Sequence, residues 1–248
     1  MTTPIIVTGA SRGIGAATAR LAARRGHPVL LNYRTGAAEA EHLATRIAED
    51  GGTAHAMQGD MSVEADIIAM FEACDGAFGP LGGLVNNAGI TGPIGRVENL
   101  ERDVLQGVLA VNVIGPMLCA REAVRRMSTA HGGPGGAIVN VSSRASELGG
   151  PNELVHYAAS KGAIDSFTIG LAKEVAGEGI RVNAVNPGLI DTEIHAKAGS
   201  PDRLERLVPG VPMARVGSAD EVAETILWLM SDAASYVTGV TVPISGGR

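Results

Sequence analysis

Cysteine and aromatic residues are both scarce in this sequence of 248 residues, and each shortage excludes a class of protein. The two cysteines, Cys74 and Cys119, each lie within an apolar helical pattern, which favours buried packing over a disulfide framework or a metal site. Aromatic residues make up 3% of the chain against 45% hydrophobic residues, so the core must be mainly aliphatic. The 34 glycines predict elements that approach one another closely, as helices packed on a parallel sheet do.

An excess of positive charge is also missing, because the formal net charge at pH 7 is −6. That balance argues against a nucleic-acid partner and against an anionic membrane surface. The six histidines form no spaced ligand set, so we expect no metal site. A strand pattern begins at residue 4, which leaves no room for a signal peptide, and no apolar run approaches the length of a membrane span. We therefore expect a soluble, cytoplasmic protein.

Short apolar runs alternate with longer helical patterns along the whole chain. Most of these runs do not alternate polar and apolar residues, which is typical of strands buried on both faces. The βα alternation, without a linker or a repeat, predicts one α/β domain over residues 1–248, with a doubly wound parallel sheet and helices on both faces. The predicted strands are residues 4–8, 28–33, 53–59, 82–86, 136–142, 180–186 and 239–244, and the predicted helices are residues 14–25, 37–50, 62–78, 101–129, 154–176 and 218–230.

Two stretches depart from this regular pattern. Residues 189–213 form the longest irregular segment, and a segment of that length inside a compact domain is typical of a lid over an active site. Pro116 lies in the middle of the strong helical pattern over residues 101–129. Because proline cannot donate a hydrogen bond to the carbonyl four residues earlier, we expect the helix to end or kink there and to leave the Asn112 carbonyl free.

A glycine-rich turn follows the first predicted strand. The sequence TGASRGIG, residues 8–15, carries glycines at positions 9, 13 and 15 and runs directly into a helix. Glycines allow a tight turn and a close approach of the backbone to a pyrophosphate, whose charge the helix N-terminus favours. Alone, such a stretch could be only a turn, but its position between a strand and a helix favours dinucleotide binding.

A tyrosine and a lysine four positions apart, Tyr157 and Lys161, share one face of the helix predicted over residues 154–176. By itself this spacing is usually structural. The sequence NVSS ends the fifth predicted strand, and ligands in such sheets bind at the carboxyl ends of the strands. Ser142 or Ser143 could therefore meet Tyr157 over a bound nicotinamide.

Together these motifs resemble those of the short-chain dehydrogenase/reductase family, and the resemblance spans essentially the whole chain. It implies a single-domain Rossmann fold with a seven-stranded sheet, and reversible hydride transfer between a nicotinamide and an alcohol or carbonyl at CH–OH groups. It also implies a homotetramer. The matching features, in the family's order, are TGxxxGxG at residues 8–15, NNAG at 86–89, Asn112, Ser143, YxxxK at 157–161 and NPGLIDT at 186–192.

The resemblance assigns catalytic roles to Asn112, Ser143, Tyr157 and Lys161. Tyr157 would give a proton to the carbonyl oxygen during reduction, while Ser143, the second serine of its pair as in the family, holds that oxygen. Lowering the pKa of a tyrosine from about 10 to near 7 requires roughly 4 kcal/mol, which we expect the charge of Lys161 to supply. In the family, the asparagine matching Asn112 helps to form a proton path through water.

The cofactor-binding residues follow from the same motifs. Asp60, at the end of the third predicted strand, could accept a hydrogen bond from the adenine amino group, although an acid before a helix is also an ordinary cap. The whole predicted set is Gly9, Ser11, Arg12, Gly13, Ile14, Gly15, Asn32, Tyr33, Arg34, Asp60, Met61, Asn86, Ala88, Gly89, Tyr157, Lys161, Pro187, Gly188, Ile190 and Thr192.

The end of the second predicted strand favours NADP over NAD. NAD-specific sites place an Asp or Glu there to bind the ribose hydroxyls, and this chain has Asn32, Tyr33 and Arg34 instead. Arg34, with Arg12 of the glycine loop, could bind a 2′-phosphate through charge-assisted hydrogen bonds. Arg12 is common in this family's loop, so the preference for NADP is inferred mainly from Arg34 and from the missing acid.

The substrate cannot be read from the sequence beyond a small carbonyl or secondary alcohol. The chain resembles both 3-oxoacyl-carrier-protein reductases and glucose-type sugar dehydrogenases, so an NAD-dependent sugar dehydrogenase is one alternative. Another is a catalytically idle dinucleotide-binding sensor or scaffold, which would be expected to have lost a catalytic residue.

Apolar residues on more than one face of two predicted helices favour a homotetramer of dihedral symmetry, because one sheet face cannot cover them all. These residues are Val104, Leu105, Val108, Val111, Ile114, Leu118, Ile164, Phe167, Ile169 and Leu171.

Overall fold

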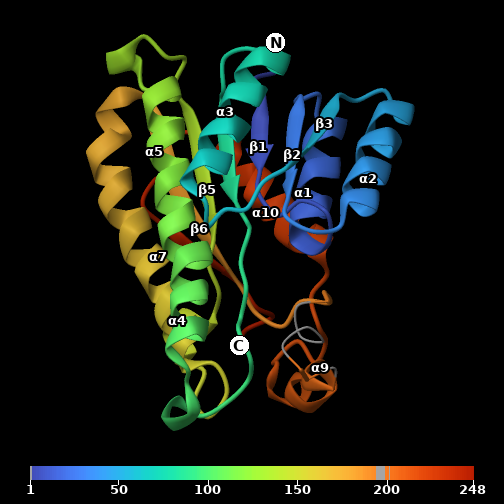
Figure 1. The fold of residues 1–248 in the computed structure, drawn as a ribbon, viewed down its shortest axis with the longest axis vertical. Helices are drawn as coiled ribbons and strands as arrows, with labels where there is room; N and C mark the ends of the chain where they lie inside the picture. The colour runs from blue at the N-terminus through green and yellow to red at the C-terminus, as the bar shows by residue number, and fades with distance from the viewer. Residues whose placement is uncertain (1, 194–198, 201) are drawn as a thin grey trace.

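A computed structural model of the chain describes residues 2–193, 199–200 and 202–248. Its centre is a seven-stranded sheet in which every neighbouring pair of strands is parallel, in the order β3-β2-β1-β4-β5-β6-β7 (Figure 1). The chain thus forms one α/β domain, and the predicted doubly wound sheet is confirmed. The strands are β1 (Ile5–Val7), β2 (Val29–Tyr33), β3 (Ala54–Gln58), β4 (Gly83–Asn86), β5 (Gly136–Val141), β6 (Ile180–Pro187) and β7 (Thr241–Ile244).

Helices cover both faces of this sheet. One layer contains α1, α2 and α10, and the other contains α3, α5 and α7, with α4 extending α5 (Figure 1). Short helices that the sequence did not predict follow β5 and β6, and α9 lies below the strands in the figure. The α-helices are α1 (Gly13–Arg24), α2 (Ala37–Glu49), α3 (Glu64–Phe78), α4 (Arg102–Leu109), α5 (Gly115–Met127), α6 (Ala145–Leu148), α7 (Val155–Val175), α9 (Arg203–Leu207) and α10 (Ala219–Met230).

Successive residues of the central strands pack alternately into two hydrophobic cores, one on each face of the sheet. Ile5 and Val7 pack into the cluster under α1 and α10, whereas Ile6 packs into the cluster under α3 and α5. Because both faces are buried, the strands read as continuous apolar runs rather than alternating ones. Cys74 and Cys119 belong to the second cluster, and burial raises the pKa of each thiol to about 12, so both act as packing side chains.

The helix predicted over residues 101–129 neither ends nor breaks at Pro116. Instead α4 passes into a π-helical turn at Ala110–Ile114, and Pro116 then occupies the first turn of α5. Proline is tolerated in a first turn, and the wider π turn before it removes the demand for a hydrogen bond to the carbonyl four residues back. The irregularity falls on Asn112, which is fully buried.

The same helical run, Arg102–Met127, is long and apolar enough to cross a membrane by length and composition alone. The expectation that no apolar segment reaches that length is therefore wrong for the helix as folded. In this structure α5 packs on β4 and β5, and 39% of the most apolar window is buried inside the protein. A helix in the core of a soluble protein can be equally long and apolar, so this run is weak evidence for a membrane span.

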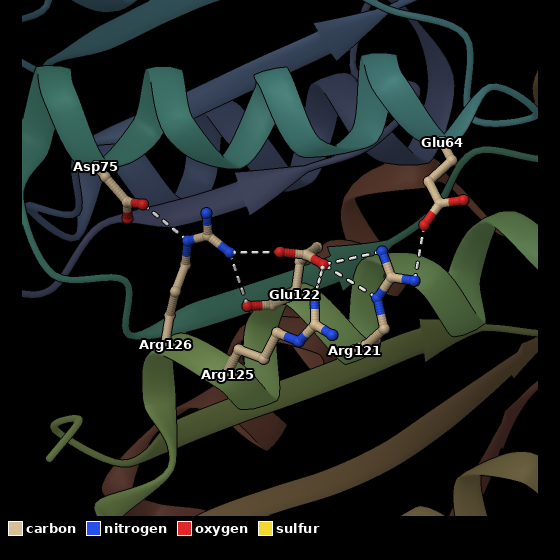
Figure 2. A network of polar contacts seen from close by, with 6 residues as sticks. All are labelled: Glu64, Asp75, Arg121, Glu122, Arg125 and Arg126. Carbon is tan, nitrogen blue, oxygen red and sulfur yellow. Dashed lines mark hydrogen bonds and ion pairs between the residues drawn. The ribbon is translucent and has the colours of Figure 1, made fainter. Parts of the chain in front are cut away.

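A buried carboxylate joins α5 to α3. Glu122 is 5% exposed, and its two oxygens lie 2.8–2.9 Å from the guanidinium groups of Arg121, Arg125 and Arg126. Burial raises the pKa of Glu122, but the hydrogen bonds from Arg126 and Arg121 lower it by more, so the net pKa is lowered. Figure 2 shows the complete network, in which Arg121 also binds Glu64, and Arg126 also binds Asp75 of α3.

We predict that Glu122→Gln lowers the free energy of unfolding at pH 7 by about 1 to 3 kcal/mol, because a charge-assisted network loses its central anion. The folded-state pKa lies below the unfolded value of about 4.3, so this stabilisation is present above that value and lost as the pH falls through the folded pKa. Urea unfolding at pH 7 and pH 3.5 measures both effects. Glu224→Gln, at an exposed pair with Arg25, is the matched control and should change stability by under about 0.5 kcal/mol. Equal stability of Glu122→Gln and wild type at pH 7 contradicts the role of the network.

Candidate active site

A cavity of about 850 Å³ opens at the carboxyl ends of the strands, between the glycine loop and the segment after β6. This is where a doubly wound sheet places its ligands, and the volume lies in the range of small-molecule and cofactor sites. Eighteen of the predicted site residues line it: Gly9, Ser11, Arg12, Gly13, Ile14, Asn32, Arg34, Asp60, Met61, Ala88, Gly89, Ser143, Tyr157, Lys161, Pro187, Gly188, Ile190 and Thr192.

Four predicted site residues, Gly15, Tyr33, Asn86 and Asn112, do not line the cavity. Tyr33 is 8% exposed within β2. The Asn86 amide is buried beneath the cavity floor, where it donates to the Pro116 carbonyl at 3.2 Å and to Asn140 at 2.9 Å. Gly15 acts through packing, because a Cβ there would lie 2.4 Å from the Gly9 carbonyl oxygen. These residues support the site from behind.

The glycine loop is held by Asn87, the residue after the predicted site residue Asn86. Asn87 lines the cavity, and its Nδ2 donates to the carbonyls of Thr8 at 2.8 Å and Gly9 at 3.0 Å. Gly9 and Gly13 have φ values of +65° and +55°, a region that favours glycine. α1 begins at Gly13, so its N-terminus faces the cavity. This arrangement fits the pyrophosphate of a dinucleotide.

Ser143 and Tyr157 lie together at the cavity wall, where the Ser143 hydroxyl lowers the pKa of the phenol against the effect of burial. The two serines of NVSS differ clearly, because Ser142 is 3% exposed and donates to the Lys161 carbonyl at 3.0 Å. Ser143 Oγ also accepts from the Ala145 amide at 3.1 Å, at the start of α6. The serine and the phenol thus lie where they can contact one substrate oxygen together.

Lys161 lies close to the Tyr157 ring, and its effect on the pKa of the phenol stays a prediction. Its Nζ donates to the Val141 carbonyl at 2.7 Å and lies 5.7 Å from the centroid of the Tyr157 ring. Burial raises the pKa of Tyr157, and the opposing effects of the Ser143 hydrogen bond and the charge of Arg203 are smaller. Burial also lowers the pKa of Lys161 to about 8, against the charge of Asp165. The phenol is therefore held protonated at neutral pH.

Asn112 positions the loop after β4 from behind the site. Its Oδ1 accepts from the Ile90 amide at 2.9 Å, and its Nδ2 donates to the Ile90 carbonyl at 2.8 Å and to Ser160 Oγ at 3.0 Å. A Cβ built on Gly89 would lie 3.4 Å from Asn112 Oδ1 and 3.5 Å from Lys161 Nζ. The π turn, the loop and α7 therefore meet at Gly89.

Two arginines reach the cavity near the end of β2. Arg34 lies 3.6 Å from an Asp60 oxygen, and Arg12 lies 3.0 Å from Glu193 and 3.3 Å from Thr35 Oγ1. Burial raises the pKa of Asp60, but its hydrogen bonds with Ser62 and the charge of Arg34 lower it by more.

Asn32 lines the cavity, and both ends of its amide are hydrogen-bonded within the protein. Its Oδ1 accepts from the Gly9 amide at 3.3 Å, and its Nδ2 donates to the Gly59 carbonyl at 3.0 Å.

Several charged residues of the cavity were missed by the sequence analysis. None lies in a motif, although Arg144 and Glu193 directly follow the predicted site residues Ser143 and Thr192. Arg203, Arg206 and Arg248 reach the cavity from α9 and from the segment after β7. Across the described ranges, no group of three or more His, Cys, Asp or Glu side chains could hold a metal. Of the predicted lid over residues 189–213, residues 194–198 and 201 lie outside the described part. The missed charged residues are Arg144, Glu153, Glu193, Arg203, Arg206 and Arg248.

Comparisons with known proteins agree with this geometry. A family model described as enoyl-(acyl carrier protein) reductase matches residues 9–248. The chain is 53% identical over 243 residues to the uncharacterized oxidoreductase YgfF of Escherichia coli K12, covering 98% of both chains. It is also 35% identical to glucose 1-dehydrogenase 2 of Bacillus subtilis, over 98% of this chain and 93% of that protein.

Among solved structures, a 3-ketoacyl-(acyl-carrier-protein) reductase from Brucella melitensis complexed with NADH is similar, with a TM-score of 0.91 and 34% identity over 99% of this chain and 98% of that one. A blue fluorescent protein from a metagenomic library, in complex with NADPH, has a TM-score of 0.90 and 32% identity over 99% and 97% of the two chains. By its fold, its motifs and these relatives, the chain is an oxidoreductase of the short-chain dehydrogenase/reductase family.

Proposed function

We propose that this oxidoreductase transfers a hydride reversibly between NADP(H) and a small carbonyl or secondary alcohol, with Tyr157 as the general acid and base. The observation that carries the proposal is that Ser143 and Tyr157 lie together in the wall of a cavity that begins at the glycine loop. Lys161, one helical turn after Tyr157, lines the same cavity.

The nicotinamide, when bound, supplies or accepts the hydride. Tyr157 donates a proton to the carbonyl oxygen during reduction, and the raised pKa of its phenol keeps that proton in place until then. Ser143 Oγ donates a hydrogen bond to the same oxygen and fixes its position. Lys161, held by the Val141 carbonyl, and Asn112, held by Ile90, form the wall behind the phenol. In oxidation, Tyr157 takes the proton back.

The residues present fit a dinucleotide with a 2′-phosphate better than one without. Gly9 and Gly13 adopt the backbone conformations of a phosphate loop, and no acid stands at the end of β2. Arg12 and Arg34 both line the cavity there, and both already contact carboxylates. The two solved relatives hold NADPH and NADH, so the preference rests on Arg34 and the missing acid.

The substrate class is supported by relatives of several kinds. Curated relatives include a 3beta-hydroxysteroid dehydrogenase, a glucose dehydrogenase and a cis-4-hydroxycyclohexanecarboxylate dehydrogenase, each named for a secondary alcohol or a sugar. An NAD-dependent sugar dehydrogenase and a catalytically idle sensor remain the competing functions.

Assembly as a homotetramer is part of the proposal. Val108, Val111 and Ile164 are buried within the chain, but Ile114 is 53% and Ile169 43% exposed, which is typical of residues that pack against a second copy. Light scattering of the purified protein measures the assembly. A cytoplasmic location stays a prediction from the sequence, which cell fractionation tests.

We predict that Tyr157→Phe lowers the rate of carbonyl reduction on the order of 100- to 10,000-fold, because the variant keeps the ring but has no proton to donate. NADPH oxidation with a panel of small carbonyl compounds measures the rate, and fluorescence titration measures NADPH binding, which should persist. Tyr236→Phe, at a fully exposed tyrosine, is the matched control and should leave the rate unchanged. If the wild type binds NADPH yet reduces nothing above background, the sensor alternative is favoured.

For the cofactor, we predict that Arg34→Ala lowers kcat/KM for NADPH by about 10- to 100-fold, the loss of one charge-assisted hydrogen bond, and leaves kcat/KM for NADH nearly unchanged. The single variant is preferred to one that adds Asn32→Asp, because Asn32 donates to the Gly59 carbonyl and an aspartate could not. Arg46→Ala, on the exposed face of α2, is the control. Equal efficiency of the wild type with both cofactors would show that Arg34 does not read a phosphate.

Lys161→Met should raise the free energy of unfolding at pH 7 by about 1 to 3 kcal/mol, because it removes an amine whose charge burial disfavours. The folded pKa of about 8 lies below the unfolded value near 10.4, so the charge destabilises the folded protein below pH 8. The advantage of the variant should fade between pH 8 and 10.5. Urea unfolding at pH 7 and 10 measures the difference in stability between the variant and the wild type. Lys173→Met, in the same helix, is the control. A Lys161→Met protein that is less stable than the wild type at pH 7 contradicts the prediction.

A further inference from the structure

Four arginines that the proposed mechanism does not use gather in the cavity beyond Ser143 and Tyr157. They come from the chain just after β5, from α9 and from the segment after β7. Glu153 is the one carboxylate side chain that lines the cavity among them in the part of the chain that the structure describes. We call this set, Arg144, Arg203, Arg206 and Arg248, the arginine cluster.

The cluster is tied to the reacting end of the cavity. The backbone amide of Arg144, the residue after Ser143, donates to the Pro187 carbonyl at 3.0 Å. Arg144 Nε donates to a main-chain oxygen of Arg248 at 2.8 Å, and Ser245 Oγ donates to the same oxygen at 2.8 Å. The backbone of Arg248 is thus fixed beside the strand end that carries Ser143.

Glu153 is fully engaged by two members of the cluster. One oxygen lies 3.1 Å from Arg203 Nε and the other lies 2.8 Å from Arg206 Nη2. Burial raises the pKa of Glu153, but Arg206 and Arg203 lower it by more, so this carboxylate stays ionised. Both of its oxygens are therefore occupied by other arginines.

Arg248 is left without an anionic partner. Among the described residues, its guanidinium makes no hydrogen bond or ion pair, although it lines the cavity. Burial lowers the pKa of Arg248, the charges of Arg203 and Arg144 lower it further, and only Glu153 opposes them. A guanidinium that faces a cavity among other cations provides a site for an anion, and its planar fork matches a carboxylate or a phosphate.

The anion site lies close to the reacting group, because Arg144, whose side chain donates to Arg248, directly follows Ser143, and all three residues line the same cavity as Tyr157. An ion pair that only fastens α9 to the loop before α7 would account for Glu153, Arg203 and Arg206. It does not account for Arg248, which Glu153 does not bind.

We propose that the substrate carries an anionic oxygen group, a carboxylate or a phosphate, which binds Arg248 in the arginine cluster while its carbonyl meets Ser143 and Tyr157. The substrates are then short oxo acids, or their hydroxy-acid or phosphorylated counterparts, with the anion a few carbons from the reacting carbon. This inference rests on the proposed reductase activity and narrows its substrate class.

The first test compares matched substrates on the wild-type enzyme with NADPH: 3-oxo, 4-oxo and 5-oxo carboxylates, their methyl esters, and ketones that carry a phosphate at the same distances. We expect kcat/KM for at least one anionic series to exceed that for the esters by 10-fold or more. The better of the two anionic series identifies the group. Esters reduced as well as the acids overturn the inference and leave the reductase activity intact, whereas no reduction in any series overturns the proposed function itself.

The second test uses Arg248→Gln, with Arg46→Gln on α2 as the matched loss of an exposed arginine. We expect Arg248→Gln to raise KM for the anionic substrate by 10-fold or more and to leave kcat/KM for a methyl ester unchanged. A change of the same size for both substrates would mean that Arg248 only supports the fold. The wild-type KM for the anionic substrate should also rise with ionic strength while that for the ester does not, which keeps the inference testable if the variant is unstable.

Discussion

Buried asparagine amides hold the carboxyl edge of the sheet, where the backbone ladder stops and the cavity begins. Asn32 joins β2 to Gly9 and Gly59, the residues just beyond the neighbouring strands. Asn86 donates to Asn140, which in turn donates to Thr168 of α7. An unpaired polar group in such a place is costly, and the nitrogen atoms of these amides all find acceptors, whereas Asn86 Oδ1 has no hydrogen-bond partner among the described residues. Each amide joins two elements at once. The glycine loop, the floor of the cavity and α7 all depend on this layer.

The charge of the cavity is opposite to that of the chain. The protein has a formal net charge of −6, yet seven cationic side chains line the cavity against three carboxylates. Low-dielectric walls concentrate such a field and raise the local concentration of anions. At one end Arg12 and Arg34 already contact Glu193 and Asp60, so an incoming phosphate must compete for them. Beyond Tyr157, Arg248 has no such competitor among the described residues.

The sequence predicted best what depends on local backbone rules. Short apolar runs, most of them unalternating, identified the seven strands, and the glycine positions identified the turn into α1, because both follow from near neighbours in the chain. The effect of Pro116 was predicted only in part. Proline cannot donate to the carbonyl four residues earlier, and a kink and a π turn are two ways to accommodate that lack; the structure contains the π turn. The sequence predicted Asn86 as a cofactor residue, whereas Asn87 lines the cavity and Asn86 is the last residue of β4. Residue order alone does not fix where β4 ends, so it does not decide which of the two side chains faces the cavity.

The electrostatics of the site could not be predicted, because they arise from side chains distant in sequence. Arg12 meets Glu193 across 181 positions, and Arg144 meets the backbone of Arg248 across 104. The spacing of Tyr157 and Lys161 places both on one helix face, but it cannot say whether the amine faces the phenol or the Val141 carbonyl. That choice depends on β5, whose Val141 carbonyl accepts from the amine, and the charge of Arg203 of α9 adds an effect that lowers the pKa of the phenol. A local motif thus specifies which groups are present, whereas the tertiary fold decides which charge each of them experiences.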